Sequence, residues 1–183
     1  VGPTIFRELV EKIEGVVLLT MYDHEVSRLQ ELVGPKVVVL SIRDSKGMEF
    51  PDVVIVDFFK SLSNEHQKPW RKLLQGKNDG LLPEMETMLK QLYTAITRCS
   101  KRLFVAETGP SDSCDAFMRW CTERKDGPSI AVKQDVSNVD KMKKTHDEWV
   151  STGITYAMKA EETDEKALYW LEKAMDDFEL EKY

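Results

Sequence analysis

Residues 43–49, RDSKGME, form a short polar loop between two apolar runs, 36–42 and 52–59. A glycine in such a loop allows a tight turn with positive φ, and the backbone amides of that turn can face phosphate or ribose oxygens. The flanking runs are continuously apolar, which is typical of strands covered on both faces of a parallel sheet. Ligands of such sheets bind at the carboxyl ends of the strands, and the polar loop leaves such an end.

Arg98 is the second residue that could carry chemistry. Its planar, permanently charged guanidinium suits the charge that develops during phosphoryl transfer. Residues 84–100 have apolar side chains at helical spacing and 102–107 indicates a strand, so Arg98 is expected near the end of a helix. A lone arginine at such a place is more often favoured by the helix dipole or by a surface ion pair. We expect this helix end, the polar loop and the end of the apolar run 15–20 to meet.

The elements that position these residues alternate along the chain, which predicts an α/β fold with a parallel sheet and right-handed crossovers. Residues 60–83 have no clean period and are expected to form an irregular excursion with one short helix. Asp23 is a candidate N-cap and Gly34 a stop signal for the first of the helices. Strands are expected at 15–20, 36–42, 52–59 and 102–107, and helices at 23–33, 84–100 and 114–124.

Composition indicates a soluble globular protein with one core and a small appendage. The 183 residues are 42% apolar and 32% charged, and no run approaches the roughly 18 apolar residues of a membrane span. Three cysteines without a CxxC pattern favour reduced thiols in an intracellular compartment, either nuclear or cytoplasmic. The net charge of -6 excludes no function class, because a near-neutral core can still carry a local basic groove.

The C-terminal part differs from the rest in composition, with 7 Lys against 12 Asp or Glu in residues 137–183. Residues 126–138 are expected to connect the first domain, 1–125, to a helical appendage, 139–183. Two helices are expected there, over 139–160 and 164–181. Their apolar stripe requires a cover, either the chain's own core, a following repeat or a protein partner. The stripe consists of Leu168, Leu171, Met175 and Phe178.

Two segments resemble motifs of one enzyme family. Residues 41–56, SIRDSKGMEFPDVVIV, resemble motif V of the UvrD/Rep-type superfamily 1 helicases, T-x-H-x-[SA]-K-G-L-E-F followed by an apolar strand. Residues 92–105, LYTAITRCSKRLFV, resemble their motif VI, Y-V-A-x-T-R-A-x-x-x-L. The resemblance spans roughly residues 16–107 and implies the C-terminal RecA-like domain, a P-loop NTPase-type fold. A closer likeness is to eukaryotic TPR and ankyrin repeat-containing helicase-like proteins, through the FF after the strand and a tryptophan-bearing insertion.

The resemblance also implies roles for individual residues. Glu49 would accept a hydrogen bond from the nucleotide ribose, beside the turn at Gly47. Arg98 would be the catalytic arginine finger that reaches the γ-phosphate of ATP. The nucleic-acid backbone would lie along Ser41, Arg43, Ser45 and Lys46. The tail is similar to one tetratricopeptide hairpin, with Trp149, Gly153 and Tyr156 on its first helix and Ala167, Leu171 and Ala174 on its second.

The chain lacks several motifs that contribute to the nucleotide site in this family. It contains no G-x-x-x-x-G-K-[ST] phosphate loop and no N-Y-R-S motif. ATP and Mg²⁺ would therefore be held mainly by an N-terminal RecA-like domain of the complete protein, and residues 1–183 alone should neither bind nor hydrolyse ATP. Asp57 imitates a Walker B carboxylate, but a structural role is favoured because no phosphate loop lies beside it. No metal ligand is assigned.

Other departures weaken the nucleic-acid assignment more than the nucleotide assignment. Arg43 replaces the family histidine and Met48 the leucine, and only residues 34–36 fill the gap where the family has a large accessory domain. Two hypotheses therefore remain. The chain belongs either to an ATP-dependent helicase-like motor on DNA or RNA, with single-stranded nucleic acid as a candidate partner, or to a catalytically silent helicase-like scaffold that binds proteins.

Overall fold

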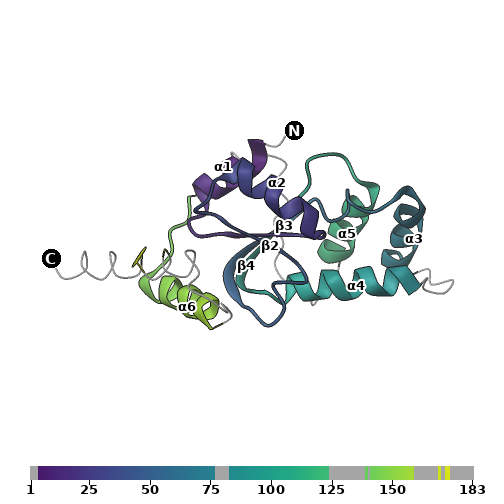
Figure 1. Cartoon of the computed structure of the whole chain (residues 1–183). Coiled ribbons are helices and arrows are strands. Elements are labelled where there is room, and N and C mark those ends of the chain that lie inside the picture. Colours follow the sequence, from purple (N-terminus) through teal and green to yellow (C-terminus); the bar gives the residue numbers. More distant parts are fainter. Residues whose placement is uncertain are drawn as a thin grey trace.

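The computed structural model describes residues 4–76, 83–123, 139, 141–158, 169 and 172–173. This part of the chain contains one sheet of parallel strands in the order β2-β1-β3-β4 (Figure 1). The strands are β1 (Val17–Thr20), β2 (Val38–Ser41), β3 (Phe50–Val56) and β4 (Cys99–Ala106). All four expected strands are present, which confirms the α/β class.

Helices cover both faces of the sheet. They are α1 (Thr4–Lys12), α2 (Asp23–Val33), α3 (Asn64–Leu74), α4 (Pro83–Ile96), α5 (Asp112–Glu123) and α6 (His146–Ala157). Strand side chains point alternately to opposite faces, so Val17 and Leu19 pack in one core with α3 to α6, whereas Leu18 packs in a second core with α1 and α2. Figure 1 shows α1 and α2 together above the sheet and α3 to α5 grouped away from them. None of the described helices is long and apolar enough to cross a membrane.

Four aromatic rings hold α3 and α5 against the end of β3. The ring centroids of Phe59 and Trp70 lie 5.8 Å apart in an edge-to-face arrangement, and those of Phe59 and Phe117 lie 5.1 Å apart. Phe58 also packs edge-to-face on Trp70. Large aromatic side chains dominate core energetics, so Trp70 anchors the excursion 60–83, which contains the single expected helix in its described part.

The helix expected over 84–100 is shorter than its apolar spacing suggests. It ends at Ile96, because Cys99 already pairs with Phe50 in the sheet. Pairing between strands determines the conformation of residues 99 to 101, whatever their helical spacing, since strand preference depends on the neighbouring strand more than on the residue itself. Arg98 consequently lies in the tight connection between α4 and β4.

No helix is expected before the first strand, yet α1 occupies Thr4–Lys12. Its signal is present in the sequence, because Phe6, Leu9, Val10 and Ile13 follow the spacing of one helix face. Phe6, Leu9 and Ile13 are buried against the sheet. A helix that packs on the sheet therefore precedes the first strand.

The C-terminal part packs on the domain through α6. The helix begins at His146, later than the expected 139, because residue Met142 is extended and forms a parallel bridge with Ile13. Trp149 is buried in the core that also holds α3 to α5, so in its described part the appendage is covered by the chain's own core. Other expected features lie outside the described residues: the connector 126–138, Ala167, Leu168, Leu171, Ala174, Met175 and Phe178.

Candidate functional site

The polar loop runs from the carboxyl ends of the strands to their amino ends. Ser41 pairs with Thr20, and Thr20 pairs with Val56, so the loop begins where three strands end. Phe50 pairs with Cys99 at the opposite edge, where β3 and β4 begin. We call the side of the sheet where the strands end the carboxyl edge, and the side where they begin the amino edge. The expected meeting of three features at one place is therefore wrong, because the loop joins the end of β1 at one edge and the end of α4 at the other.

Two predicted nucleic-acid residues build the loop instead of facing solvent. The Ser41 hydroxyl donates to the Asp44 carboxylate at 2.8 Å and accepts from the Asp44 amide at 3.1 Å. The Ser45 hydroxyl donates to the Ile42 carbonyl at 2.8 Å. Both serines are buried, so these hydroxyls shape the first turn of the loop. These hydroxyls can influence a ligand through the backbone conformation that they stabilise.

Arg43 is the exposed cation at the carboxyl edge. Its side chain is 76% exposed and lies 2.7 Å from the Asp23 carboxylate. Asp23 was expected to cap α2, but the N-cap is Tyr22, which leaves the Asp23 carboxylate to pair with Arg43. An exposed pair contributes about 1 kcal/mol or less, so a phosphate can compete for this guanidinium. Lys46 is exposed on the same loop.

Gly47 and Glu49 form the end of the loop nearest the amino edge. Gly47 has φ +83, the left-handed conformation that glycine adopts without strain, and a side chain at this position would meet no atom within 4 Å. Both residues are exposed. Within the described part of the chain, the Glu49 carboxylate makes no hydrogen bond or ion pair. A carboxylate presented in this way can accept hydrogen bonds from a ligand hydroxyl.

Arg98 joins this end of the loop from a position about fifty residues away in the sequence. Its Nη1 donates to the Met48 carbonyl at 2.7 Å, between Gly47 and Glu49 in sequence. Its Nε donates to the Thr94 carbonyl at 3.1 Å, and its Nη2 donates to the Thr97 hydroxyl at 3.1 Å. The structure therefore brings Gly47, Glu49 and Arg98 together and places Arg43 at the opposite edge.

Asp57 has the contacts of a structural residue. Its φ of +47 is rare for a residue other than glycine, and its carboxylate accepts hydrogen bonds from the amide and hydroxyl of Thr108. Glu107 accepts from the amides of Phe59 and Lys60 at 2.9 Å each. Burial raises the pKa of Glu107 to about 7. These two carboxylates hold the turn after β3.

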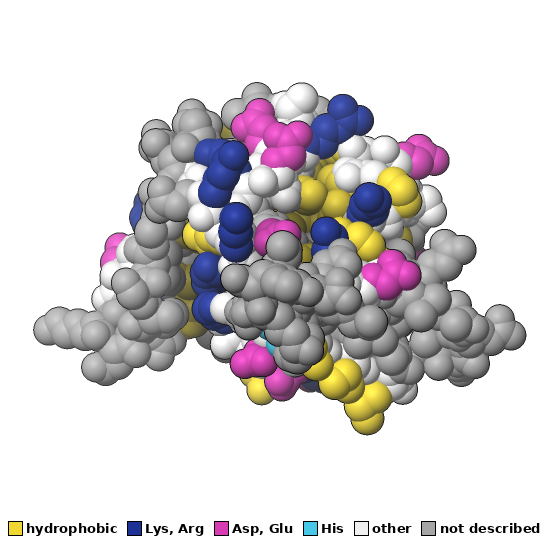
Figure 2. Space-filling model, turned by 90° about the vertical axis from the view of Figure 1, so that its left-hand side faces the viewer, with side chains coloured by type: hydrophobic (Ala, Val, Ile, Leu, Met, Phe, Trp, Pro, Cys, Tyr) yellow, Lys and Arg dark blue, Asp and Glu magenta, His cyan; other side chains and the backbone are white. Residues whose placement is uncertain are grey.

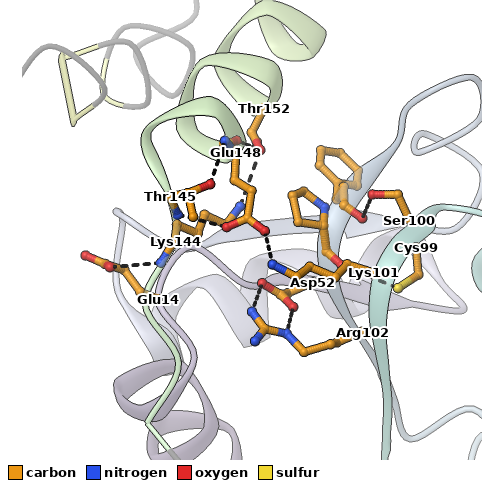
Figure 3. Close-up of polar contacts among 12 residues, drawn as sticks. Glu14, Asp52, Cys99, Ser100, Lys101, Arg102, Lys144, Thr145, Glu148 and Thr152 are labelled. Carbon is orange, nitrogen blue, oxygen red and sulfur yellow. Dashed lines mark hydrogen bonds and ion pairs between the residues drawn. The ribbon is translucent and has the colours of Figure 1, made fainter. Parts of the chain in front are cut away.

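A network of charged residues beside the amino edge was not predicted. Figure 3 shows Lys144, Thr145 and Glu148 facing Asp52 and Lys101 of the sheet. Its sequence signal is a capping box, T-x-x-E at 145–148, in which the Thr145 amide donates to the Glu148 carboxylate at 2.8 Å. The sheet side of the network has no signal, because it depends on strand register.

Lys144 is buried in this network. Its ammonium donates to the Thr152 hydroxyl at 3.3 Å and lies 5.4 Å from the Trp149 ring centroid. Burial lowers the pKa of Lys144 to about 8, although carboxylates from three directions oppose the shift. The charged groups that face it are Asp52, Glu148, Glu14 and Arg102.

Replacing Lys144 by methionine should therefore change the pH dependence of stability. The folded-state pKa of Lys144 lies below the unfolded value, so the contribution of Lys144 to the free energy of unfolding rises as the pH passes from about 8 to 10.5. One pKa unit corresponds to about 1.4 kcal/mol, so the rise should reach roughly 3 kcal/mol. Lys144→Met should lose this rise and be more stable than wild type at pH 7. Urea unfolding at pH 7 and pH 10 measures both, and an identical pH dependence in the two proteins would contradict the expectation.

One face of the molecule carries local positive charge despite the net charge of -6. Figure 2 shows Lys and Arg side chains gathered in a column on this face. Lys141 and Lys143 are exposed on the extended segment before α6, and Lys101 is exposed on β4. A phosphate backbone that approached this face would therefore not meet a uniformly acidic surface.

One known protein is similar to this chain over part of its length. The human TPR and ankyrin repeat-containing protein 1 is 26% identical, and the match covers 66% of this chain and 5% of the relative. No protein-family profile matches the chain. No solved structure matches it. The chain thus spans a small part of that relative, and the similarity does not establish an activity.

Proposed function

We propose that this chain is the C-terminal RecA-like domain of a helicase-like ATPase of the UvrD/Rep type. The observation that carries the proposal is the 2.7 Å hydrogen bond from Arg98 to the Met48 carbonyl. It joins the arginine of the motif VI-like segment to the glycine turn of the motif V-like segment. Two separate sequence resemblances thus converge on one place, as a shared nucleotide site requires.

The residues at this place fit one side of a bound ATP. Glu49 offers an exposed acceptor for a ribose hydroxyl, and Arg98 offers a guanidinium for a γ-phosphate. The described residues contain no group of three or more His, Cys, Asp or Glu side chains arranged for a metal ion. In this proposal an N-terminal RecA-like domain supplies most of the contacts to the triphosphate and holds the Mg²⁺ that would neutralise charge on the phosphates.

Arg98 would have to change partners to act on a phosphate. In the present arrangement it fixes the end of the loop, and a ligand phosphate would replace the neutral carbonyl and hydroxyl acceptors with a charged one. A phosphate carries the opposite charge to the guanidinium and can accept two parallel N–H···O bonds from it, which favours that exchange. The arrangement thus holds the guanidinium near the site before nucleotide arrives.

Single-stranded nucleic acid is the proposed partner at the carboxyl edge, along Arg43 and Lys46. Both cations are exposed, while Ser41 and Ser45 support the loop that carries them. Phosphate contacts of this kind position a strand without reading its sequence. A protein partner or further helical repeats are proposed for the C-terminal helical segment.

A silent scaffold is the second candidate function, and the contacts of Arg98 favour it. All three guanidinium nitrogens donate hydrogen bonds within the chain, to Thr94, Met48 and Thr97. An arginine with this set of partners can have a purely structural role. The two candidates differ in whether the full-length protein binds and turns over ATP.

Glu49→Ala tests the nucleotide site directly. In the full-length natural protein that contains this chain, the substitution should raise the Kd for ATP by about 10- to 100-fold, because it removes a hydrogen bond to a charged acceptor worth about 1.5–3 kcal/mol. The same substitution should leave the Kd for 2′,3′-dideoxy-ATP unchanged, since that nucleotide lacks the ribose hydroxyls. Isothermal titration calorimetry gives both constants, with Glu65→Ala on the exposed surface of α3 as the control. Equal loss for both nucleotides would exclude a ribose contact.

A further inference from the structure

Side chains join the starts of β3 and β4 into one unit, which we call the β3–β4 zipper, residues 48–52 and 98–102. Arg98 donates to the Met48 carbonyl at 2.7 Å, and the Phe50 amide donates back to the Arg98 carbonyl at 2.8 Å. The Ser100 hydroxyl donates to the Phe50 carbonyl at 3.2 Å. Each contact crosses between the same two segments, so a shift of one segment disturbs the whole set.

The far end of the zipper is an ion pair in the sheet. Arg102 donates to both carboxylate oxygens of Asp52, at 2.5 and 2.8 Å, and the Asp52 side chain is fully buried. The hydrogen bond with Asp52 raises the pKa of Arg102. A bidentate pair of this kind fixes the relative position of the two strands. Arg98 and Arg102 thus clamp the two ends of the zipper.

A β-bulge lies between these two clamps. The register runs from Phe50 opposite Cys99 to Asp52 opposite Arg102, so β4 contains one more residue than β3 in this interval. Bulges of this kind redirect a side chain and are over-represented next to active sites. Lys101 lies in the bulge, and its ammonium contacts the Glu148 carboxylate of α6 at 2.5 Å.

Glu148 links this bulge to the start of α6. One carboxylate oxygen accepts from Lys101, and the other accepts from the Thr145 amide in the capping box. Burial alone would raise the pKa of Glu148, but the hydrogen bonds from Lys101 and Thr145 outweigh it and leave the pKa lowered. Figure 3 shows these contacts side by side with the Asp52–Arg102 pair. The same carboxylate therefore serves the helix and the strand.

We propose that Glu148 is a positioning residue for Arg98, so that docking of α6 and placement of the Arg98 guanidinium form one coupled element. Glu148 holds Lys101 in the bulge, the bulge sets the register of the zipper, and the zipper places Arg98 against Met48. Its effect on catalysis rests on the proposed function, whereas the coupling itself does not. A partner that binds α6 and displaces it from the sheet would then change the position of Arg98 through these contacts.

Hydrogen exchange measured by mass spectrometry on the full-length protein tests the coupling without nucleotide. Glu148→Gln keeps the capping box, which accepts either Glu or Gln, but removes the charge that holds Lys101. It should reduce protection about 3- to 10-fold in peptides covering α6 and in those covering 45–52 and 97–103. Lys101→Met breaks the same pair from the strand side and should give the same result. Glu86→Gln removes the exposed Glu86–Lys90 pair on α4 and should change neither region.

Coupling between two parts of a protein is reciprocal, which supplies a second test. Arg98→Ala should reduce the protection of α6 by a factor similar to that which Glu148→Gln produces at 45–52. Loss of α6 protection in Glu148→Gln with unchanged exchange at 45–52 and 97–103 would overturn the proposal. So would unchanged α6 exchange in Arg98→Ala.

Enzyme kinetics separates this inference from the proposed function. If the full-length protein hydrolyses ATP, Glu148→Gln should lower kcat several-fold with the ATP Kd unchanged, because it displaces the finger and leaves the ribose contact intact. An unchanged kcat together with reduced exchange protection would overturn the positioning role. If the wild type does not hydrolyse ATP but both exchange experiments show coupling, the proposed function fails and the structural coupling stands.

Discussion

Replacing Arg98 by alanine is expected to lower kcat for ATP hydrolysis by about 10³- to 10⁵-fold in the full-length natural protein that contains this chain. An arginine finger neutralises charge that develops only in the transition state, so its loss slows turnover much more than it weakens ground-state binding. The measurement is kcat at saturating ATP, with the nucleotide Kd determined separately by calorimetry. The Kd should change by less than about tenfold.

Two further variants distinguish chemistry from structure at this position. Arg98→Lys retains the charge but loses the planar fork, and it should recover only a small part of the lost rate. Arg119→Ala removes an exposed arginine from α5 and should behave as wild type. A kcat for Arg98→Ala within a few-fold of wild type would show that the hydrogen bonds to Met48, Thr94 and Thr97 are the whole role of Arg98.

Among the variants proposed for the stability measurements, Arg102→Met should lower the free energy of unfolding most, by about 3–5 kcal/mol. Urea unfolding of residues 1–183 measures this loss. The reason is that Asp52 is fully buried and would lose its bidentate partner, which leaves a buried carboxylate uncompensated. The free energy of unfolding is the quantity compared, at constant pH and salt.

The double variant Asp52→Val with Arg102→Met provides the matched control. Removing both charges leaves no unpaired ion, so most of the lost stability should return. Arg71→Met breaks an exposed pair with Asp112 of similar length, 2.8 Å, and should cost less than about 1 kcal/mol. Equal losses for Arg71→Met and Arg102→Met would refute the assignment of a buried, mutually dependent pair.

The sheet could be predicted because its signal is local. The runs 36–42 and 52–59 are apolar at most positions, and in the structure their apolar side chains fill both cores. Continuous burial on two faces leaves a simple pattern in the sequence. The helix α1 had an equally local signal in the spacing of Phe6, Leu9 and Ile13, so its omission is an error of interpretation and not a limit of the sequence.

The arrangement of the site could be predicted only in part. Arg98 lies against the loop segment that contains Gly47 and Glu49, but its partner there is the Met48 carbonyl, and a backbone group leaves no trace in the sequence. Whether a serine such as Ser45 faces solvent or its own loop depends on turn geometry, because its hydroxyl can bond to a nearby carbonyl.

The link between α6 and β4 could not be read from the sequence, since it depends on a one-residue bulge. Lys101 reaches Glu148 because β4 has an extra residue between Cys99 and Arg102. Residues 47 positions apart have no shared periodicity, so only the folded register brings them into contact. The capping box at 145–148 is a local sign of where α6 starts that the prediction missed, and it carries no sign of what α6 contacts.

Steady-state ATP hydrolysis by the wild-type full-length protein, with and without single-stranded DNA or RNA, tests the central proposal most directly. We expect Mg²⁺-dependent turnover that a nucleic-acid strand stimulates, while residues 1–183 alone remain at background. Turnover by the purified 1–183 chain would contradict its assignment as half of a two-domain ATPase. No turnover by the full-length protein under any of these conditions would contradict the motor and favour the scaffold.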